Sequence, residues 1–193
     1  MSYKLRDPYF RRAKEEGYLA RSVYKLQEID VRYKLLRPGI HVIDLGAAPG
    51  SWTQYVIQKG GPTARVFAVD IQPLRWSSPQ VEFLQMDVFS SQVERDVEER
   101  KCDGLLSDMA PATTGSRATD QVRSAMLVHR SLQLAFLGVR PGGFWVAKLL
   151  EGPERETLLR EAQALFADVH VYRPKSTRKG STECFLVGRG RLS

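Results

Sequence analysis

The fold of this chain is decided by the stretch His41-Val-Ile-Asp-Leu-Gly-Ala-Ala-Pro-Gly-Ser-Trp52. Its first residues are apolar and indicate a buried strand that Asp44 ends. The glycines at positions 46 and 50 predict a tight turn, and Pro49 suits the first turn of a helix over 51–59. Open α/β sheets build their ligand crevices from these parts, at the carboxyl ends of the strands. We therefore expect a ligand beside this turn.

Length and composition favour one soluble globular domain. The chain has 193 residues, of which 42% are hydrophobic, and we expect one domain over 1–193 with a basic helical extension, 1–39, packed on it. No run of about 18 apolar residues predicts a membrane span, and the N-terminus lacks an apolar signal core. The two cysteines, at 102 and 184, lack the spacing of zinc ligands, which favours a reduced cytoplasmic compartment and no metal.

The net charge of +7 is concentrated at the two ends of the chain. Residues 1–39 hold ten Lys and Arg against five Asp and Glu, and residues 173–193 hold six against one, whereas residues 40–172 are mildly acidic. Two basic ends around an acidic body suggest a polyanion laid over one surface. The alternative is that these charges only keep the protein in solution.

Strand and helix patterns alternate after residue 40. The expected strands are 41–45, 65–70, 81–86, 103–108, 143–150, 168–172 and 182–188, and the expected helices are 7–16, 22–33, 51–59, 90–100, 119–139 and 153–166. This alternation predicts a seven-stranded, mostly parallel sheet with helices on both faces. Only a short basic loop joins the last two strands, so the last strand should be antiparallel.

Two helices carry apolar stripes that should face a core. The stripe of the second helix consists of Val23, Leu26, Ile29 and Tyr33. The stripe of the long helix consists of Val122, Met126, His129, Leu132, Phe136 and Val139.

The turn after the first strand excludes several ligands. It reads GxxxG, whereas a dinucleotide-binding turn reads GxGxxG, and no Walker lysine follows it. A nucleoside-containing ligand without a phosphate bridge fits better than a nicotinamide dinucleotide. Asp70 ends the next strand and could accept the hydroxyls of a ribose, and Asp87 ends the third and could accept from an adenine amino group. The alternative for each carboxylate is a cap for the following helix.

Lys148 is a charged residue in an otherwise apolar strand. It interrupts the apolar run 144–150, and a lysine near the end of a buried strand costs free energy unless it is paired or neutral. Asp108 also ends a strand, and in the usual strand order the two strands are neighbours. We therefore expect the two side chains to meet in one crevice.

Four motifs together resemble the FtsJ/RrmJ family of RNA 2′-O-methyltransferases. Asp44-Leu-Gly-Ala-Ala-Pro-Gly-Ser-Trp52 is similar to its S-adenosylmethionine motif, except that Ser51 stands where the family has a second glycine. Ser107-Asp-Met-Ala-Pro111 with Thr114-Gly115, Arg21-Ser-Val-Tyr-Lys-Leu26 and Arg178-Lys-Gly-Ser-Thr-Glu183 resemble the other signatures. The matches span about residues 7–190, and they imply a Rossmann-like methyltransferase fold.

The resemblance also implies the site residues. A Lys-Asp-Lys-Glu tetrad would fall on Lys25, Asp108, Lys148 and Glu183. S-adenosylmethionine, whose product is S-adenosylhomocysteine, would contact Gly50, Trp52, Asp70, Asp87 and Asp108. The alternatives are a plain ion pair for Lys148 and Asp108, a solvated lysine beside Glu28 for Lys25, and a surface acid near Arg178 or Lys179 for Glu183.

The implied reaction moves a methyl group from the sulfonium of S-adenosylmethionine to a ribose 2′-hydroxyl, and it needs no metal. Lys148 is the candidate base, while Lys25 and Glu183 would position the ribose. Because RNA alone carries this hydroxyl, the basic ends gain a phosphate-binding role. The phosphate-binding candidates are Lys4, Arg6, Arg11, Arg12, Lys14, Arg21, Arg173, Lys175, Arg178 and Lys179. The interleaved Tyr9, Phe10, Tyr18 and Tyr24 are candidates for packing or for stacking on a base.

The leading hypothesis is therefore methylation of large-subunit ribosomal RNA, at a uridine, by a monomeric protein of the cytoplasm, or of an organellar matrix if a presequence has been removed. One alternative is a ribose methyltransferase acting on the tRNA anticodon loop. An alternative of another class is a non-catalytic RNA-binding factor of ribosome assembly, although such a protein has no need of Lys148 inside a strand.

Overall fold

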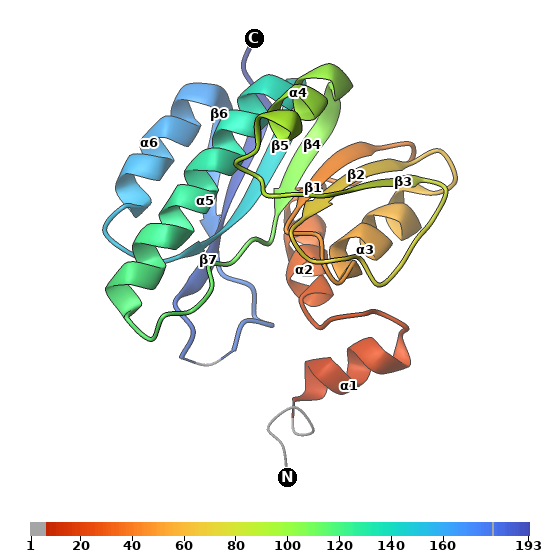
Figure 1. Cartoon of the computed structure of the whole chain (residues 1–193), viewed down its shortest axis with the longest axis horizontal. Helices are drawn as coiled ribbons and strands as arrows, with labels where there is room; N and C mark the ends of the chain where they lie inside the picture. Colours follow the sequence, from red (N-terminus) through yellow and green to blue (C-terminus); the bar gives the residue numbers. More distant parts are fainter. Residues whose placement is uncertain (1–6, 179) are drawn as a thin grey trace.

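The computed structural model describes residues 7–178 and 180–193, which fold around one seven-stranded sheet (Figure 1). The strands are β1 (His41–Leu45), β2 (Arg65–Asp70), β3 (Val81–Gln85), β4 (Cys102–Ser107), β5 (Val139–Leu150), β6 (Phe166–Tyr172) and β7 (Glu183–Arg191). The helices are α1 (Pro8–Glu15), α2 (Val23–Tyr33), α3 (Ser51–Gly60), α4 (Ser91–Arg100), α5 (Arg117–Gly138) and α6 (Arg155–Leu165). Each element lies within a few residues of its predicted range.

The sheet has the order β3-β2-β1-β4-β5-β7-β6. Strands β1 to β5 pair in parallel, and β7 lies between β5 and β6, antiparallel to both. The predicted antiparallel last strand is thus confirmed. The prediction that the strands of Asp108 and Lys148 are neighbours is confirmed as well, since Ser107 of β4 pairs with Ala147 of β5. These pairings bring the ends of β1, β2, β3 and β4 to one edge of the sheet.

Local signals explain where several helices begin and end. Asp7 caps α1 as predicted, because its carboxylate accepts hydrogen bonds from the backbone N–H groups of Tyr9 and Phe10. Ser90 and Ser116 cap α4 and α5 in the same way. Helices α2 and α4 each end at a lysine in the left-handed conformation, Lys34 and Lys101.

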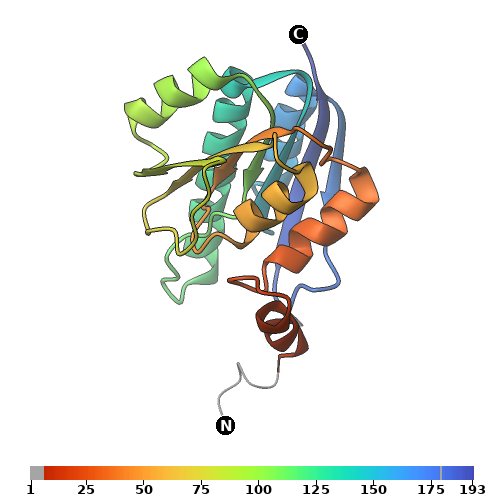
Figure 2. The same ribbon diagram turned by 90° about the vertical axis from the view of Figure 1, so that its right-hand side faces the viewer.

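Two apolar layers cover the two faces of the sheet (Figures 1 and 2). Helices α2 and α3 pack on one face, and α4, α5 and α6 pack on the other. The predicted stripe of α2 is confirmed, with Val23, Leu26 and Ile29 buried and Tyr33 partly buried. This helix lies on the face of the sheet, where it reaches Phe185 of β7.

The predicted stripe of α5 is wrong. Val122, Met126 and Phe136 are about half exposed, and of the helical positions in that stripe only Leu132 is buried. The buried face instead consists of Ser124, Ala125, Val128, Arg130, Ser131, Leu132, Leu134, Ala135 and Gly138. Small side chains dominate this face because the helix packs closely on the sheet, so large apolar residues were a misleading guide to its orientation.

Candidate functional site

The glycine turn after β1 passes close to the end of β4. Gly46 has a φ of 72°, and a Cβ on it would lie 2.8 Å from the backbone nitrogen of Met109. Only glycine therefore allows the turn to run beside the Asp108-Met109 segment. Pro49 lies in the turn itself, after a cis peptide bond, and α3 begins two residues later with Gly50 as its N-cap. The expectation that Pro49 forms the first helical turn is corrected accordingly.

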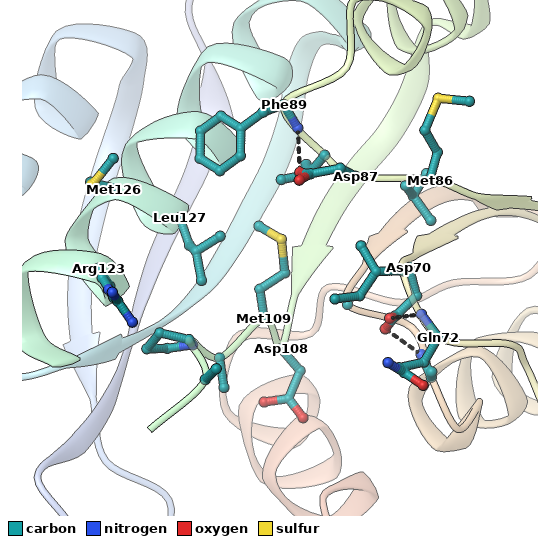
Figure 3. A pocket seen from close by; sticks show the side chains of 18 residues that line it. Asp70, Gln72, Met86, Asp87, Phe89, Asp108, Met109, Arg123, Met126 and Leu127 are labelled. Carbon is teal, nitrogen blue, oxygen red and sulfur yellow. Dashed lines mark hydrogen bonds between the residues drawn. The ribbon is translucent and has the colours of Figure 1, made fainter. Parts of the chain in front are cut away.

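A cavity of about 510 Å³, called here the larger cavity, opens at the carboxyl ends of β1 to β4 (Figure 3). Its lining comprises Gly46, Ala48, Val69, Asp70, Ile71, Gln72, Met86, Asp87, Val88, Phe89, Asp108, Met109, Ala110, Pro111, Ala112, Arg123, Met126 and Leu127. Three predicted carboxylates, Asp70, Asp87 and Asp108, thus meet around one space. The remaining walls are mainly apolar, as is usual for a small-molecule site.

The Asp70 carboxylate is held in a fixed orientation. Its Oδ2 accepts a hydrogen bond from the backbone N–H of Ala48 over 2.9 Å, and its Oδ1 accepts from the N–H of Gln72 over 2.7 Å. A carboxylate oxygen can accept a second hydrogen bond, so both oxygens retain a free lone pair. Asp70 can therefore receive two hydroxyls without rearranging the turn.

Asp87 does not cap α4, since Ser90 holds that position. Its Oδ1 accepts from the backbone N–H of Phe89 over 3.0 Å, and its backbone oxygen accepts from the N–H of Ser90. The carboxylate lies against the larger cavity, where Phe89 and Met86 flank it (Figure 3). Its position suits an acceptor at the far end of a nucleoside.

Gly50 and Trp52 lie outside the lining of the larger cavity. The Trp52 indole is buried, donates to the backbone oxygen of Ser22 over 2.9 Å and packs against Phe185. Ser51 stands where the similar motif of the FtsJ/RrmJ family has glycine. It is buried, with its Oγ 3.0 Å from the Oγ of Ser22. These residues join α3 to α2, and the contact of Gly50 and Trp52 with a cofactor stays a prediction.

The four tetrad positions form two ion pairs. Lys148 Nζ donates to Asp108 Oδ1 over 2.8 Å, and Lys25 Nζ lies 2.7 Å from Glu183 Oε1. All four side chains are at most 15% exposed. The predicted meeting of Lys148 with Asp108 is confirmed. The second pair is an electrostatic contact, since its angles are not those of a hydrogen bond and Oε1 has no hydrogen-bond partner.

The register of β5 and β7 brings the two ion pairs together. Lys148 pairs with Phe185, so Glu183 lies two residues away on the same face of the sheet. Lys25 reaches that face from α2, with its Nζ 6.0 Å from the centre of the Phe185 ring. The geometry therefore gathers three elements around the end of β5, with Asp108 turned toward them from β4.

A second cavity, the polar cavity, has a volume of about 310 Å³. It is lined by Arg21, Ser22, Lys25, Thr177, Arg178, Ser181 and Glu183. Asp108 lines the larger cavity, whereas Lys25 and Glu183 line the polar cavity, so the tetrad has one cavity on each side. Thr177 Oγ1 is buried without a hydrogen-bond partner among the described residues. Neither spacing nor composition marked Thr177 or Leu127 as site residues, whereas Met109 lay within the motif Ser107-Asp-Met-Ala-Pro111 without an assigned role.

The two basic ends of the chain meet beside the polar cavity. Arg21 pairs with Asp7 and donates to the backbone oxygen of Ser176, and Arg178 lies 3.8 Å from Asp7. Glu28 accepts from the backbone N–H groups of Lys175 and Ser176 over 2.6 and 2.9 Å. Helices α1 and α2 and the β6–β7 loop therefore form one surface.

The other phosphate-binding candidates differ in their exposure and in whether they already form an ion pair. Arg11 is exposed, whereas Arg12 pairs with Glu16 and lies over the Tyr24 ring. Tyr9 packs on Tyr24, which leaves Phe10, 40% exposed, as the aromatic side chain most open to a base. Lys4, Arg6 and Lys179 lie outside the described residues.

Asp44 is buried behind the glycine turn and carries the most perturbed carboxyl of the site. Burial, together with the charges of Asp108 and Asp70, raises its pKa to about 7, while the Thr53 hydroxyl opposes the shift by donating over 2.6 Å. Its Oδ1 is unpartnered in the described part of the chain. A carboxyl that titrates near neutral pH therefore lies under the site.

No histidine or cysteine of the described chain lines the larger cavity or the polar cavity. His129 and His170 form surface pairs with Glu161 and Asp168, and both cysteines are buried. Within residues 7–178 and 180–193, His, Cys, Asp and Glu side chains form no group of three that could hold a metal ion. No helix of the described chain is long and apolar enough to cross a membrane.

Solved structures with this architecture include methyltransferases. A ribosomal RNA methyltransferase of Plasmodium falciparum superposes with a TM-score of 0.79 at 24% identity, over 91% of this chain and all of that one. The human methyltransferase-like protein 13, solved with S-adenosylhomocysteine, superposes with a TM-score of 0.58 at 17% identity, over 81% and 75% of the two chains. The likeness to these structures shows a Rossmann-like fold, with the larger cavity at the carboxyl ends of its strands.

The chain belongs to the FtsJ-like methyltransferase family, whose profile matches residues 18–191. Among its relatives, the ribosomal RNA large subunit methyltransferase E of Syntrophobacter fumaroxidans is 47% identical over 191 residues, 97% of each chain. The protein of the same name from Bdellovibrio bacteriovorus is 43% identical over 192 residues, 97% of this chain and 98% of that one.

Proposed function

We propose that this enzyme transfers a methyl group from S-adenosylmethionine to a ribose 2′-hydroxyl of large-subunit ribosomal RNA. The observation that carries the proposal is the tetrad of Lys25, Asp108, Lys148 and Glu183 between two cavities. One cavity suits a nucleoside cofactor and the other a polar acceptor.

The larger cavity fits S-adenosylmethionine by its donor set and by its shape. Asp70 offers two fixed carboxylate oxygens to the ribose, and Asp87 offers an acceptor to the adenine amino group. Gly46 keeps the turn beside Met109, where a Cβ would intrude. When bound, the cofactor supplies a methyl group on a positively charged sulfur that leaves as a neutral thioether.

Lys148 is the proposed base. An alcohol is a weak nucleophile, and an amine that removes its proton during the attack accelerates such a reaction by about 10²- to 10⁴-fold. Asp108 orients the amine, since it accepts a hydrogen bond from Nζ and lies beside the larger cavity. In its neutral form, Lys148 would take the proton of the 2′-hydroxyl onto Nζ.

Lys25 and Glu183 are proposed to hold the acceptor ribose in the polar cavity. Glu183 lines the polar cavity, and we expect its carboxylate to accept from a ribose hydroxyl there. Lys25 stands 2.7 Å away and holds that carboxylate in place. Arg21 and Thr177 line the same cavity and can donate to a neighbouring phosphate. Holding the two reactants in line is expected to supply much of the rate.

The substrate follows from the relatives and from the charge. The relatives that cover 97% of this chain are named for the large ribosomal subunit, and the chain carries a net charge of +7. We therefore favour large-subunit ribosomal RNA over a tRNA anticodon loop, with a monomeric enzyme acting in the cytoplasm. A non-catalytic assembly factor is disfavoured, because a binding protein gains nothing from burying Lys148.

The test is methyl transfer to defined RNA. The purified enzyme is incubated with labelled S-adenosylmethionine and ribosomal subunits or RNA from cells that lack the protein, and the product is digested to nucleosides. A labelled 2′-O-methylnucleoside from large-subunit RNA is expected. A methylated base, or label confined to tRNA, would refute the proposal. In parallel, S-adenosylhomocysteine should raise the melting temperature and a nicotinamide dinucleotide should not.

A further inference from the structure

A basic pocket lies at the end of the sheet opposite the tetrad. It has a volume of about 400 Å³ and is formed where α2 ends and β5 begins, beside the end of β7. Its charged lining residues are Lys34, Arg37, Arg140, Arg189 and Asp103. From Gly143, at its wall, to Lys148 is five residues of β5, or about 16 Å at the usual strand rise. The pocket is therefore separate from both cavities of the reacting site.

Cations outnumber carboxylates in this pocket. Asp103 is buried, accepts a hydrogen bond from Arg37 over 2.6 Å and forms an ion pair with Arg140 over 2.7 Å. Arg189 pairs with Asp168 of β6. Lys34 is exposed and forms no ion pair with any residue that the structure describes. Four cations against two carboxylates leave a local charge of about +2, inside a concave surface that concentrates its field.

The backbone holds the pocket open. Lys34 ends α2 in the left-handed conformation with a φ of 53°, and Gly142 and Gly190 also have positive φ. A Cβ on Gly142 would meet no atom within 4 Å, so the β5 side of the pocket opens to solvent. A ligand can thus approach the basic pocket from the β5 side.

An aromatic and basic strip connects this pocket with the β6–β7 loop at the reacting site. Tyr33 stacks on His170 at 5.2 Å and meets Tyr172 edge-on at 5.8 Å. Arg32 and Arg189 lie over the same Tyr33 ring. The strip follows the seam between α2 and β6, which Figure 2 shows beside β7. Tyr172 then leads directly into the loop that carries the phosphate-binding candidates.

We infer that the basic pocket is a second binding site for the phosphate backbone of the RNA substrate, reached by RNA that leaves the tetrad along the seam of α2 and β6. This inference rests on the proposed function, since it takes RNA as the substrate. The pocket would contact phosphates and would not recognise the base sequence. Its guanidinium and ammonium groups suit phosphate oxygens, and phosphate contacts carry no sequence information. Its role is to extend the bound length of RNA beyond the target nucleotide.

Lys34 is the position to change, because its side chain supports no other part of the structure. Asparagine and aspartate tolerate the left-handed conformation better than other residues, so Lys34→Asn and Lys34→Asp remove and reverse the charge without backbone strain. Lys101 ends α4 in the same conformation, with a φ of 42°. Its Nζ donates to the backbone oxygen of Leu137 over 2.8 Å and it does not line the basic pocket, so Lys101→Asn controls for the loss of a lysine at a left-handed helix end.

The experiment compares these variants on protein-free RNA of increasing length that is centred on the methylated nucleotide. For long RNA, Lys34→Asn should raise the dissociation constant about three- to tenfold and flatten the salt dependence by about 0.7 to 0.9 in log–log slope, as loss of one phosphate contact predicts. Lys34→Asp should have the larger effect. For RNA too short to span about 16 Å from the target, no variant should differ from the wild type. Turnover at saturating RNA and cofactor affinity should be unchanged.

Three results would overturn the inference. An equal effect on short and long RNA would mean that Lys34 acts at the reacting site. Equal losses in Lys34→Asn and Lys101→Asn would mean that only net charge matters. A loss on intact ribosomal subunits but not on protein-free RNA would assign the pocket to a protein partner. If the proposed function itself were wrong, the wild-type enzyme would methylate none of these RNAs.

Discussion

Lys148 Nζ donates a hydrogen bond to Asp108 Oδ1 over 2.8 Å, and the pair lies between the larger cavity and the polar cavity. Neighbouring parallel strands, β4 and β5, supply the two residues. Because the pair is mostly buried, each side chain depends on the other for its charge partner. The arrangement fixes the Lys148 amine beside Asp108, which lines the larger cavity, and this is the position that the proposed function requires of a base.

We predict that Lys148→Arg folds and binds S-adenosylmethionine but transfers methyl groups at least about 100-fold more slowly. A guanidinium keeps the ion pair with Asp108 and cannot give up its proton near neutral pH, so it cannot serve as a base. The measurement is transfer of labelled methyl groups to target RNA at saturating cofactor.

Lys148→Ala is expected to be equally inactive and less stable, because it leaves the Asp108 carboxylate unpaired. Circular dichroism and cofactor binding of both variants separate misfolding from lost chemistry. Wild-type turnover in Lys148→Arg would reassign this lysine to electrostatic positioning.

For Asp70 we predict a specific loss of cofactor affinity. Asp70→Asn keeps one acceptor oxygen and replaces the other by an amide NH2, which accepts neither from the backbone N–H of Ala48 or Gln72 nor from a ribose hydroxyl. Loss of a hydrogen bond to a charged group should weaken S-adenosylmethionine binding about 10- to 100-fold in calorimetry. Glu98→Gln, an exposed carboxyl on α4, is the control. Equal affinities in the two variants would remove Asp70 from the ribose site.

The sheet was predictable from the sequence because its signals are local. Runs such as Val66–Val69 are apolar without interruption, and glycine and proline mark the boundaries between elements. The orientation of α5 was not predictable in the same way. Ser124 and Ser131 are buried there, and Ser131 accepts a hydrogen bond from the Trp145 indole. That partner comes from another element, which no periodicity reveals.

The reacting site was likewise predictable in part. Lys148 stands out as a charge inside an apolar strand, and Asp108 follows from strand order. The partnership of Lys25 with Glu183 joins α2 to β7, across most of the chain, and only the resemblance to known motifs indicated it. The polar cavity could not be foreseen, because Thr177 and Ser181 are ordinary loop residues until the β6–β7 loop packs against α2.

The stability of the fold should depend on the ionisation of Asp44. Its pKa is raised to about 7 in the folded protein by burial, compared with about 3.9 in an unfolded chain. The folded state therefore holds a proton that the unfolded state releases, so this contribution is complete below about pH 4 and is lost as the pH rises through 7.

Asp44→Asn cannot titrate, and its unfolding free energy should fall less than that of the wild type between about pH 5 and pH 8, by about 2 to 3 kcal/mol. Urea unfolding across this range provides the measurement, with Glu98→Gln as a surface control. Parallel pH profiles for wild type and Asp44→Asn would show that this carboxyl does not titrate in the folded protein.

The two cysteines should be inert in the native enzyme. Burial raises the pKa of Cys102 and of Cys184 to about 11, so neither forms much thiolate at neutral pH. A thiol reagent should label none in the native state and two in denaturant. Rapid labelling of either thiol without denaturant would show that β4 or the start of β7 opens readily.

The final prediction concerns the surface that the two ends of the chain form beside the polar cavity. Arg11 is exposed on α1, and Lys175 is exposed on the β6–β7 loop, where Glu28 holds its backbone. Neither side chain forms an ion pair with another described residue, so a change of charge leaves the packing intact. Arg12 is a poorer choice, since it pairs with Glu16 and covers Tyr24.

Arg11→Glu and Lys175→Glu should each weaken RNA binding several-fold at low salt, and the effect should shrink as added salt screens the phosphates. Affinity for S-adenosylmethionine should stay at the wild-type value, because neither residue lines the larger cavity. Arg95→Glu on α4, across the sheet, changes the net charge by the same amount and serves as the control. If Arg95→Glu weakened RNA binding as much as the other two variants, RNA binding would depend on the net charge of the protein, and the surface beside the polar cavity would have no special role. If only one of the two variants lost affinity, RNA would approach the tetrad from that side alone.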